Sequence, residues 1–249
     1  MKKVLGYIFS PIHYLFFGFF LLLFHPIQWL SLKLGGYSGH KRSVDILNYF
    51  LTSTYYLMGT RAKFTNVHRL PEGRPILFIA NHQSMYDIPP MIWHFRKYHA
   101  KFISKIELTK GIPSISFNLK YGGAANINRK DPKQSIGEIL KLAQRMRDQN
   151  WSAVIFPEGT RSKNGEMRAF AVAGAATILK KVPEALVVPV AIKGAWKLVQ
   201  HGAFPLSFGE KMSWTVLTPI EPAGRTPEAV LKEAEEAVKN EMADQMRKA

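Results

Sequence analysis

The chain has 249 residues, of which 47% are hydrophobic, enough to bury the core of one large domain or of one domain with an appendage. It contains no cysteine, which excludes disulfide bonds, thiolate catalysis and cysteine-ligated zinc. Lysine and arginine outnumber aspartate and glutamate by 34 to 18, and the net charge of +16 favours nucleic acid, anionic lipid or phosphorylated substrates as partners. Catalytic chemistry must therefore come from histidine, carboxylate, serine or lysine side chains.

The first segment, from Val4 to Phe24, carries no formal charge and is about as long as a bilayer core is thick. A cleaved signal peptide is less favoured, because the run ends at His25 and Pro26 and not at a small-residue cleavage site. Basic residues flank both ends, so a membrane span and a hairpin that returns to the same face both stay open. Two core helices of a soluble protein are the plain alternative, but the run is too uniformly apolar for a one-faced helix.

A second apolar stretch, from Ser43 to Met58, follows three closely spaced glycines. It predicts a helix that lies partly in lipid or packs on the first one. We therefore predict that residues 1–60 form a hydrophobic helical membrane anchor and that residues 61–249 form the catalytic domain.

From about Phe64 onward, short apolar runs alternate with helical patterns, which is typical of an α/β domain. We predict a mixed, largely parallel sheet flanked by helices, with strands at 76–80, 101–104, 124–127, 153–156, 187–192 and 214–217. Helical periodicity marks residues 136–146 and a closing amphipathic helix over 227–246. Ligands of such folds bind beyond the carboxyl ends of the strands, so the polar residues that directly follow these runs are the candidates for a site.

His82 and Asp87, which follow the first of these runs, form a candidate catalytic pair. On a continuous helix their side chains would point roughly 140° apart, so a turn must separate them if they are to meet. Asp87 would then accept a hydrogen bond from one imidazole nitrogen, fix the tautomer and raise the basicity of the other nitrogen. The spacing alone is weak evidence, and the plain alternative is a surface histidine beside a helix cap.

Two motifs carry a family resemblance. Residues 81–87 read N-H-Q-S-M-Y-D and residues 156–162 read F-P-E-G-T-R-S. The sequence here resembles the glycerolipid acyltransferases, specifically the 1-acyl-glycerol-3-phosphate acyltransferase family, whose hallmarks are N-H-x-x-x-x-D and F-P-E-G-T-R-S. Two such motifs in the same order argue against coincidence.

Further blocks extend the resemblance over most of residues 64–220. Residues 101–108 resemble the family's K-F-V-A-K-x-E-L block, and residues 188–192 resemble its V-P-V-A-I strand. In the G-x-x-F-I-D-R block, Asn126 and Asn128 replace the usual phenylalanine and aspartate, whereas Arg129 is retained. Residues 170–174 also lack the lysine of the family's F-K-x-G. These departures bear on the acyl or headgroup preference.

The resemblance implies that His82 is the general base and Asp87 its orienting partner, in agreement with the reasoning from the residues themselves. His82 would deprotonate the acceptor hydroxyl, which attacks the thioester carbonyl directly, without an acyl-enzyme. Ser84 is the rival nucleophile, but it lacks G-x-S-x-G surroundings. Backbone N–H groups or a water molecule would stabilise the oxyanion, and the sequence does not identify which.

Three cations are candidates for binding the acceptor's phosphate. Arg161 and Arg129 offer planar forks that can grip phosphate oxygens in pairs, and Lys105 offers a mobile point charge. The plain alternative for each arginine is a solvated surface charge.

The rest of the second motif is also expected to bind substrate. The resemblance implies that Glu158 orients Arg161 or binds acceptor hydroxyls, and it places Thr160 in the same binding segment. Gly159 would let the backbone approach the ligand closely.

The function implied is transfer of a fatty acyl group from acyl-CoA or acyl-ACP to the sn-2 hydroxyl of 1-acyl-sn-glycerol-3-phosphate, giving phosphatidic acid, with no cofactor and no metal. An apolar tunnel should hold the acyl chain. The alternatives are acylation of another lysolipid, with a full headgroup or of the lyso-aminolipid type, and, more remotely, a non-catalytic basic membrane-binding protein.

The expected partners are membrane lipids, lysophosphatidic acid and the acyl donor, and not nucleic acid, because no nucleic-acid-binding motif is visible. The expected location is the cytoplasmic face of the bacterial inner membrane. Anionic lipid or an acidic acyl carrier is expected to contact a set of basic residues, namely Lys33, Lys41, Arg42, Lys97 and Lys101.

Overall fold

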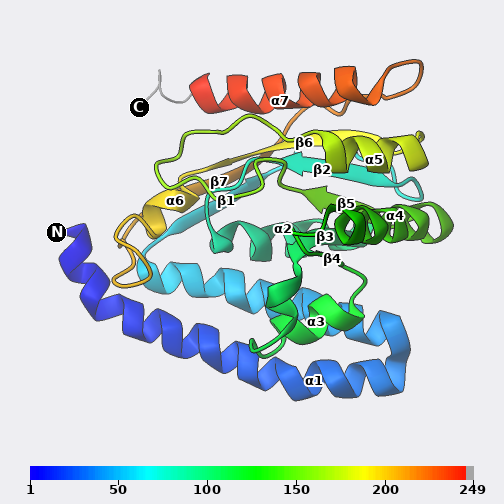
Figure 1. The fold of residues 1–249 in the computed structure, drawn as a ribbon. Helices are drawn as coiled ribbons and strands as arrows, with labels where there is room; N and C mark the ends of the chain where they lie inside the picture. The colour runs from blue at the N-terminus through cyan, green and yellow to red at the C-terminus, as the bar shows by residue number, and fades with distance from the viewer. Residues whose placement is uncertain (245–249) are drawn as a thin grey trace.

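The protein, described by a computed structural model over residues 1–244, has a seven-stranded sheet between two layers of helices (Figure 1). The strand order is β1-β7-β6-β2-β5-β3-β4, and within the described residues every neighbouring pair is parallel except β6 and β7. The predicted mixed, largely parallel α/β sheet is confirmed. The strands are β1 Arg61–Thr65, β2 Ile76–Ala80, β3 Ala100–Lys105, β4 Ala125–Ile127, β5 Ser152–Ile155, β6 Leu186–Lys193 and β7 Lys211–Val216.

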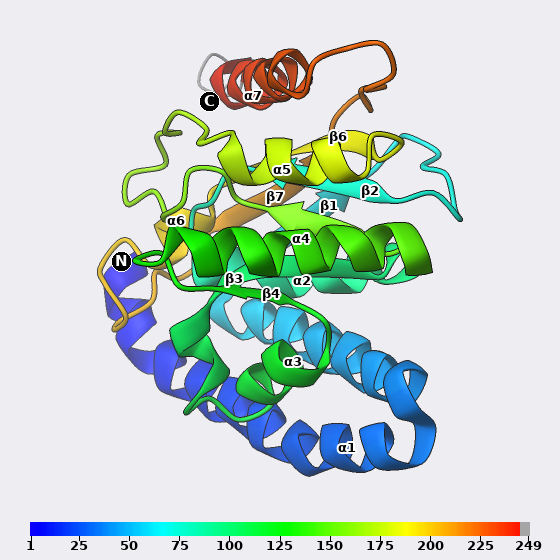
Figure 2. The ribbon, with the colours of Figure 1, turned by 45° about the vertical axis from the view of Figure 1, so that its right-hand side comes forward.

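The helices divide between the two faces of the sheet. Figure 2 shows α4, α5 and α7 over one face, and the long α1 with α2 and α3 over the other. Strand β2 serves both layers, because Ile76, Phe78 and Ala80 enter one core cluster and Leu77 and Ile79 the other. The helices are α1 Lys2–Ser53, α2 Ile88–His94, α3 Ile115–Tyr121, α4 Pro132–Gln149, α5 Ala173–Lys181, α6 Ala195–Leu198 and α7 Pro227–Asp244.

Helix α1 is a hairpin of two arms that fold back at Gly36, whose φ of 56° and ψ of −148° interrupt the helix. Stacked rings of Phe20 and Phe50, 4.8 Å apart, join the arms, and the inward faces reach the core through Phe17 and Leu47. The hairpin is therefore the geometry that the structure has, and its place in a bilayer stays a prediction.

The outward face of α1 is apolar, and by length and composition the helix could cross a membrane. Such a run of exposed apolar side chains is unusual for a soluble surface and is a sign of membrane association. Large side chains that are more than half exposed include Val4, Ile8, Leu15, Phe19, Leu22, Trp29 and Leu34.

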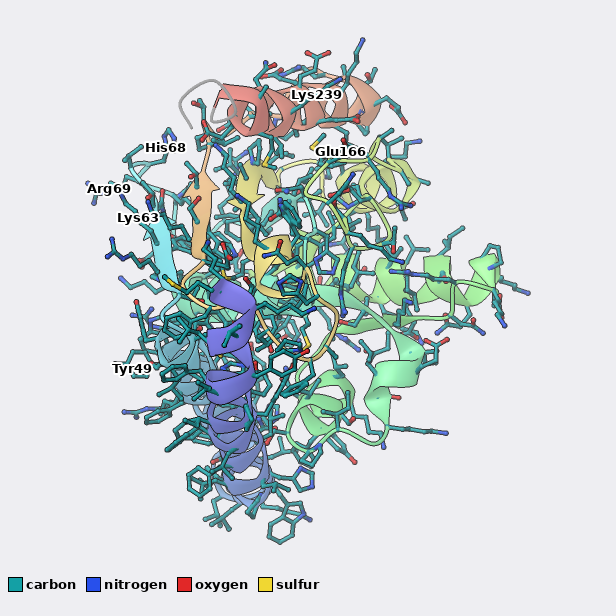
Figure 3. All side chains as sticks on the ribbon, turned by 90° about the vertical axis from the view of Figure 1, so that its left-hand side faces the viewer. Tyr49, Lys63, His68, Arg69, Glu166 and Lys239 are labelled. Carbon is teal, nitrogen blue, oxygen red and sulfur yellow. The ribbon has the colours of Figure 1, made fainter. Side chains whose placement is uncertain are left out.

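Strand β1 was not predicted, because its sequence R-A-K-F-T has no apolar run. It pairs with β7 and is the first strand in the sheet order, an edge position where charged side chains discourage pairing with another chain. Figure 3 shows Lys63 and Arg69 at this edge. The predicted closing helix is confirmed as α7 up to Asp244, and residues 245 and 246 of that prediction lie outside the described residues.

Candidate active site

The first motif begins directly after β2, at the edge of the sheet formed by the carboxyl ends of the parallel strands. Asn81 fixes the direction of the chain there. The Asn81 side-chain amide donates to the carbonyl of Ile192 at 2.8 Å, and the Ile192 N–H donates back to Asn81 Oδ1 at 2.7 Å. This reciprocal pair ties the end of β2 to β6. The chain then turns through the 3-10 helix η2 Met85–Asp87 into α2.

The turn brings His82 and Asp87 together, as predicted: Nδ1 of His82 lies 2.8 Å from Oδ2 of Asp87. The same oxygen accepts the N–H groups of Gln83 at 2.6 Å and Ser84 at 2.9 Å. Asp87 is fully buried, so these contacts define a single carboxylate position. The contact is confirmed, and the catalytic roles of the two residues stay predictions.

The imidazole of His82 is held on its flat side as well as at its edge. Its ring stacks on Phe156 with centroids 4.1 Å apart and an interplanar angle of 14°. The side chain keeps 13% of its surface exposed. With Nδ1 as the donor to Asp87, Nε2 is the basic nitrogen and is available to a substrate hydroxyl.

Ser84 is engaged in the structure of the turn itself. Its hydroxyl accepts the N–H of Tyr86 at 3.1 Å and donates to Oδ1 of Asp87 at 3.3 Å. This is a capping box, in which the hydroxyl and the carboxylate satisfy backbone donors reciprocally. A hydroxyl used in this way is poorly placed to act as a nucleophile.

The loop that carries the second motif forms hydrogen bonds with both backbone groups of His82. Oε1 of Glu158 accepts the His82 N–H at 2.7 Å, and the Ser162 N–H donates to the His82 carbonyl at 2.8 Å. Oε2 of Glu158 accepts the Arg168 N–H at 2.8 Å. Burial raises the pKa of Glu158, and these two backbone hydrogen bonds oppose that shift.

Of the two roles expected for Glu158, the contact with Arg161 is not made within the described residues, because both carboxylate oxygens accept backbone N–H groups instead. The other role, binding of acceptor hydroxyls, stays a prediction. Gly159 has φ +68°, and its N–H donates to the carbonyl of Phe156 at 3.0 Å. The space where its Cβ would stand is open. The positive φ of this tight turn favours glycine, and the close approach of a ligand to its backbone stays a prediction.

The predicted cations surround this edge of the sheet. Lys105 ends β3, Arg129 follows β4, and Thr160 and Arg161 follow β5; all four are exposed. Arg161 also lines a cavity together with Met85, whereas Lys105 and Arg129 are not among its lining residues. Whether these residues bind substrate stays a prediction.

A cavity of about 240 Å³ lies between the α1 hairpin, α2, α3 and β3. It extends from Arg161 and Met85 at the candidate site to Lys101 and Gly122 at the opposite edge of the sheet. Much of the cavity wall is apolar, and its occupation by an acyl chain stays a prediction. Its apolar lining includes Phe17, Leu47, Leu51, Ile88, Ile92 and Leu119.

Lys101 was expected at a lipid or carrier surface, and this was wrong. Its side chain is only 9% exposed and lines the cavity, with Nζ 4.7 Å from the ring centre of Tyr37 and 4.6 Å from that of Trp151. Burial and then the charge of Lys41 lower its pKa to about 7. Lys41 is itself paired with Asp45 in the same lining. The sequence carried no signal of this arrangement beyond the resemblance of residues 101–108.

Comparisons with known proteins point the same way. A chloroplastic 1-acyl-sn-glycerol-3-phosphate acyltransferase, LPAT1 of Arabidopsis thaliana, is 33% identical over 129 residues, 52% of this chain and 35% of that protein. The 1-acyl-sn-glycerol-3-phosphate acyltransferase beta of Homo sapiens is 30% identical over 128 residues, 51% of this chain and 45% of that one. The chain thus spans about a third to a half of the length of these curated relatives.

A crystal structure shows the same fold over the whole chain. The 1-acyl-sn-glycerophosphate (LPA) acyltransferase PlsC from Thermotoga maritima superposes with a TM-score of 0.80 at 22% identity, covering 99% of this chain and 98% of that one. Residues 61–193, more than half of the chain and including both motifs, match the model of the Acyltransferase family. The chain belongs to the Acyltransferase family.

Proposed function

We propose that this protein transfers a fatty acyl group from acyl-CoA or acyl-ACP to the sn-2 hydroxyl of 1-acyl-sn-glycerol-3-phosphate, giving phosphatidic acid. The observation that carries the proposal is the His82–Asp87 contact of 2.8 Å at the edge of the sheet where Arg161 lies and the cavity begins. The choice of acceptor is supported by the similarity to 1-acyl-sn-glycerol-3-phosphate acyltransferases.

In the proposed reaction, the hydroxyl oxygen of the acceptor attacks the carbonyl carbon of the thioester. Nε2 of His82 takes the proton of that hydroxyl during the attack. Asp87 holds the imidazole in one tautomer and stabilises the cation that forms. The tetrahedral intermediate then collapses, the carbon–sulfur bond breaks, and the departing thiolate takes the proton from His82. The ester and the free thiol are the products, and no covalent enzyme intermediate is formed.

The acceptor's phosphate is proposed to meet the cations at the same edge, with Arg161 the nearest to the mouth of the cavity. The Thr160 hydroxyl and the Lys105 and Arg129 side chains, all exposed there, complete an electropositive rim. Charge-assisted hydrogen bonds to phosphate are about twice as strong as neutral ones, so this rim would anchor a phosphate monoester well.

The second candidate is acylation of a lysolipid with a larger headgroup. It is favoured by the departure in residues 123–129, where Asn128 replaces the family's aspartate. The Asn128 side chain accepts the Lys130 N–H at 3.1 Å and so shapes a turn. An uncharged, structural residue at this point of the rim leaves more tolerance for a headgroup than a carboxylate would.

We further propose that the enzyme works at a membrane, with the exposed apolar face of the α1 hairpin in lipid, on the cytoplasmic face of the bacterial inner membrane. Lipid substrates and membrane lipids would then be its partners. The outward side chains of α1 support this proposal, and flotation of the protein with liposomes would test it.

The test of the main proposal is acyl transfer by the purified protein in detergent. Radiolabelled 1-acyl-glycerol-3-phosphate and a panel of other lysolipids are offered with acyl-CoA and acyl-ACP. His82→Ala should lower kcat by about 10² to 10⁴, the usual contribution of a general base. The matched control is His201→Ala, since His201 is exposed and distant in sequence from both motifs.

Phosphatidic acid formed by wild type and lost only in His82→Ala would support the proposal. If product formed from another lysolipid alone, that lysolipid would be the acceptor, and the second candidate function would be favoured. Binding to lipid without transfer to any acceptor would favour a non-catalytic membrane protein.

A further inference from the structure

The end of the cavity farthest from His82 is polar and not apolar. Gln28 and His40 both line it, with 0% and 1% of their surfaces exposed. Within the described residues, Nε2 and Oε1 of Gln28 and Nε2 of His40 have no hydrogen-bond partner. Buried polar atoms are nearly always paired in folded proteins, so three unpaired ones in one cavity wall indicate a place for a polar ligand group.

The two residues come from different arms of the α1 hairpin, on either side of the turn at Gly36. They share the cavity with Lys101, near the start of β3, whereas the last residue of β3 is Lys105 at the candidate site. Because a strand advances about 3.3 Å per residue, Lys101 lies roughly 13 Å along β3 from Lys105 at the catalytic edge. A group bound there must sit far from the thioester carbonyl.

The kind of group follows from what the wall offers. An amide presents both donors and an acceptor, and an imidazole nitrogen donates or accepts according to its tautomer. A hydroxyl, which can donate one hydrogen bond and accept others, complements such a pair. A saturated methyl terminus would leave all three atoms unpaired, which carries a penalty for a buried group.

We propose that the cavity selects acyl chains bearing a hydroxyl group near the end remote from the thioester, with Gln28 and His40 as the specificity-determining residues. This inference rests on the proposed acyl transfer and adds the class of acyl chain. The neighbouring charges do not require an anionic terminus, because Lys41 is paired with Asp45 and Lys101 lies over two aromatic rings.

The first test compares acyl-CoA donors in competition, with the same acceptor and purified wild-type protein. At each of several chain lengths the donors are the unsubstituted, the 3-hydroxy, the ω-hydroxy and the ω-carboxy chains. The ω-hydroxy chain should be preferred over the unsubstituted one by about tenfold in kcat/KM at the best length, the factor that one buried hydrogen bond is worth. The 3-hydroxy chain, whose hydroxyl stays near the site, should behave as the unsubstituted chain does.

The second test removes the polar atoms while keeping the volume. Gln28→Leu and His40→Leu should each reduce the ratio of kcat/KM for the ω-hydroxy chain to kcat/KM for the unsubstituted chain to near one. The matched control is Tyr49→Leu, on the second arm of α1 but outside the cavity lining and labelled in Figure 3, which should keep the wild-type preference.

The outcomes separate this inference from the proposed function. Transfer of all chains with equal kcat/KM by wild type would overturn the inference alone, and would mean that water pairs with these groups. A preference for the ω-carboxy chain would overturn it in favour of Lys101. Absence of transfer from every donor to every acceptor would overturn the proposed function as well.

Discussion

Nε2 of His13 lies 3.2 Å from the hydroxyl oxygen of Tyr86, so the N-terminal hairpin contacts the residue that directly precedes Asp87. Nδ1 of the same imidazole lies 3.1 Å from the carbonyl of Thr54, and the Tyr55 hydroxyl donates to the Tyr86 carbonyl at 3.0 Å. All of these groups are buried. The turn that positions the candidate base is thus hydrogen-bonded to the first arm of the hairpin and to the 3-10 helix η1 Thr54–Met58, which follows the second arm.

A double-mutant cycle on this contact should reveal coupling. His13→Leu leaves the Tyr86 hydroxyl without this partner and should lower the free energy of unfolding by about 1–3 kcal/mol. Tyr86→Phe should cost less when combined with His13→Leu than alone, with a coupling of about 0.5–3 kcal/mol. Denaturant unfolding of the four proteins in detergent measures it, and strict additivity of the two changes would contradict the coupling.

Arg161 and Arg129 should differ in their effect on the acceptor. Arg161 lines the mouth of the cavity, so Arg161→Ala should raise KM for 1-acyl-glycerol-3-phosphate by roughly 10- to 100-fold, as expected for loss of a hydrogen bond to a charged group. Arg129→Ala should have a smaller effect. Steady-state kinetics at fixed donor concentration decide the order, with Arg225→Ala as a control far along the chain. Equal KM values for the Arg161 variant and wild type would show that Arg161 does not bind the phosphate of the acceptor.

Glu158 should be needed for the shape of the site and not for its charge. In Glu158→Gln only one oxygen stays to accept the N–H groups of His82 and Arg168, so we expect a loss of about 1–3 kcal/mol in unfolding free energy and a lower kcat. Glu166→Gln is the matched control, because Glu166 is exposed in the same loop, where Figure 3 labels it. Thermal unfolding and kcat are measured for both. A Glu158 variant as stable as the control would contradict this role.

Lys101 should make stability depend on pH in an unusual direction. Its pKa falls from 10.5 to about 7 on folding, mainly through burial, so between these values the unfolded chain binds more protons than the folded one. The unfolding free energy contributed by this group therefore rises with pH from about 7 to 10 and is lowest below pH 7.

Lys101→Met should be more stable than wild type near pH 6, and its advantage should shrink as the pH rises towards 10. Denaturant unfolding at several pH values measures the difference between the two proteins, which cancels the other titrating groups. An advantage that stays constant with pH would mean that the lysine is not buried as a neutral amine at high pH.

The strands that line the middle of the sheet could be predicted from the sequence, because both of their faces are buried and their residues form continuous apolar runs. Strand β2 was placed at its observed bounds for this reason. Strand β1 was not predicted because an edge strand needs little apolar surface. Helices α2 and α3 were not predicted because seven residues are too few to show a helical period.

Some features of the candidate site could likewise be predicted from the sequence and others could not. His82 and Asp87 could be predicted because two side chains of known chemistry lie close in the chain and a second motif with the same family resemblance accompanies them. The partners of Glu158 could not, since they are backbone N–H groups, which every residue carries. The polar end of the cavity depends on Gln28 and His40 lining the same cavity from the two arms of the hairpin, and an arrangement of that kind leaves no local pattern in the sequence.

The α1 hairpin presents its outward face to the surroundings and its inward face to the sheet, and the same helical arms do both. The exposed apolar surface and the cavity wall are parts of the same helical arms, because Phe17, Leu47 and Leu51 belong to both the hairpin and the cavity lining. With the hairpin in lipid, as proposed, a load on its outer face would therefore act on the wall of the cavity and on the contact between His13 and Tyr86. Lateral pressure and thickness of the bilayer would then influence which acyl chains fit and how firmly the candidate base is held.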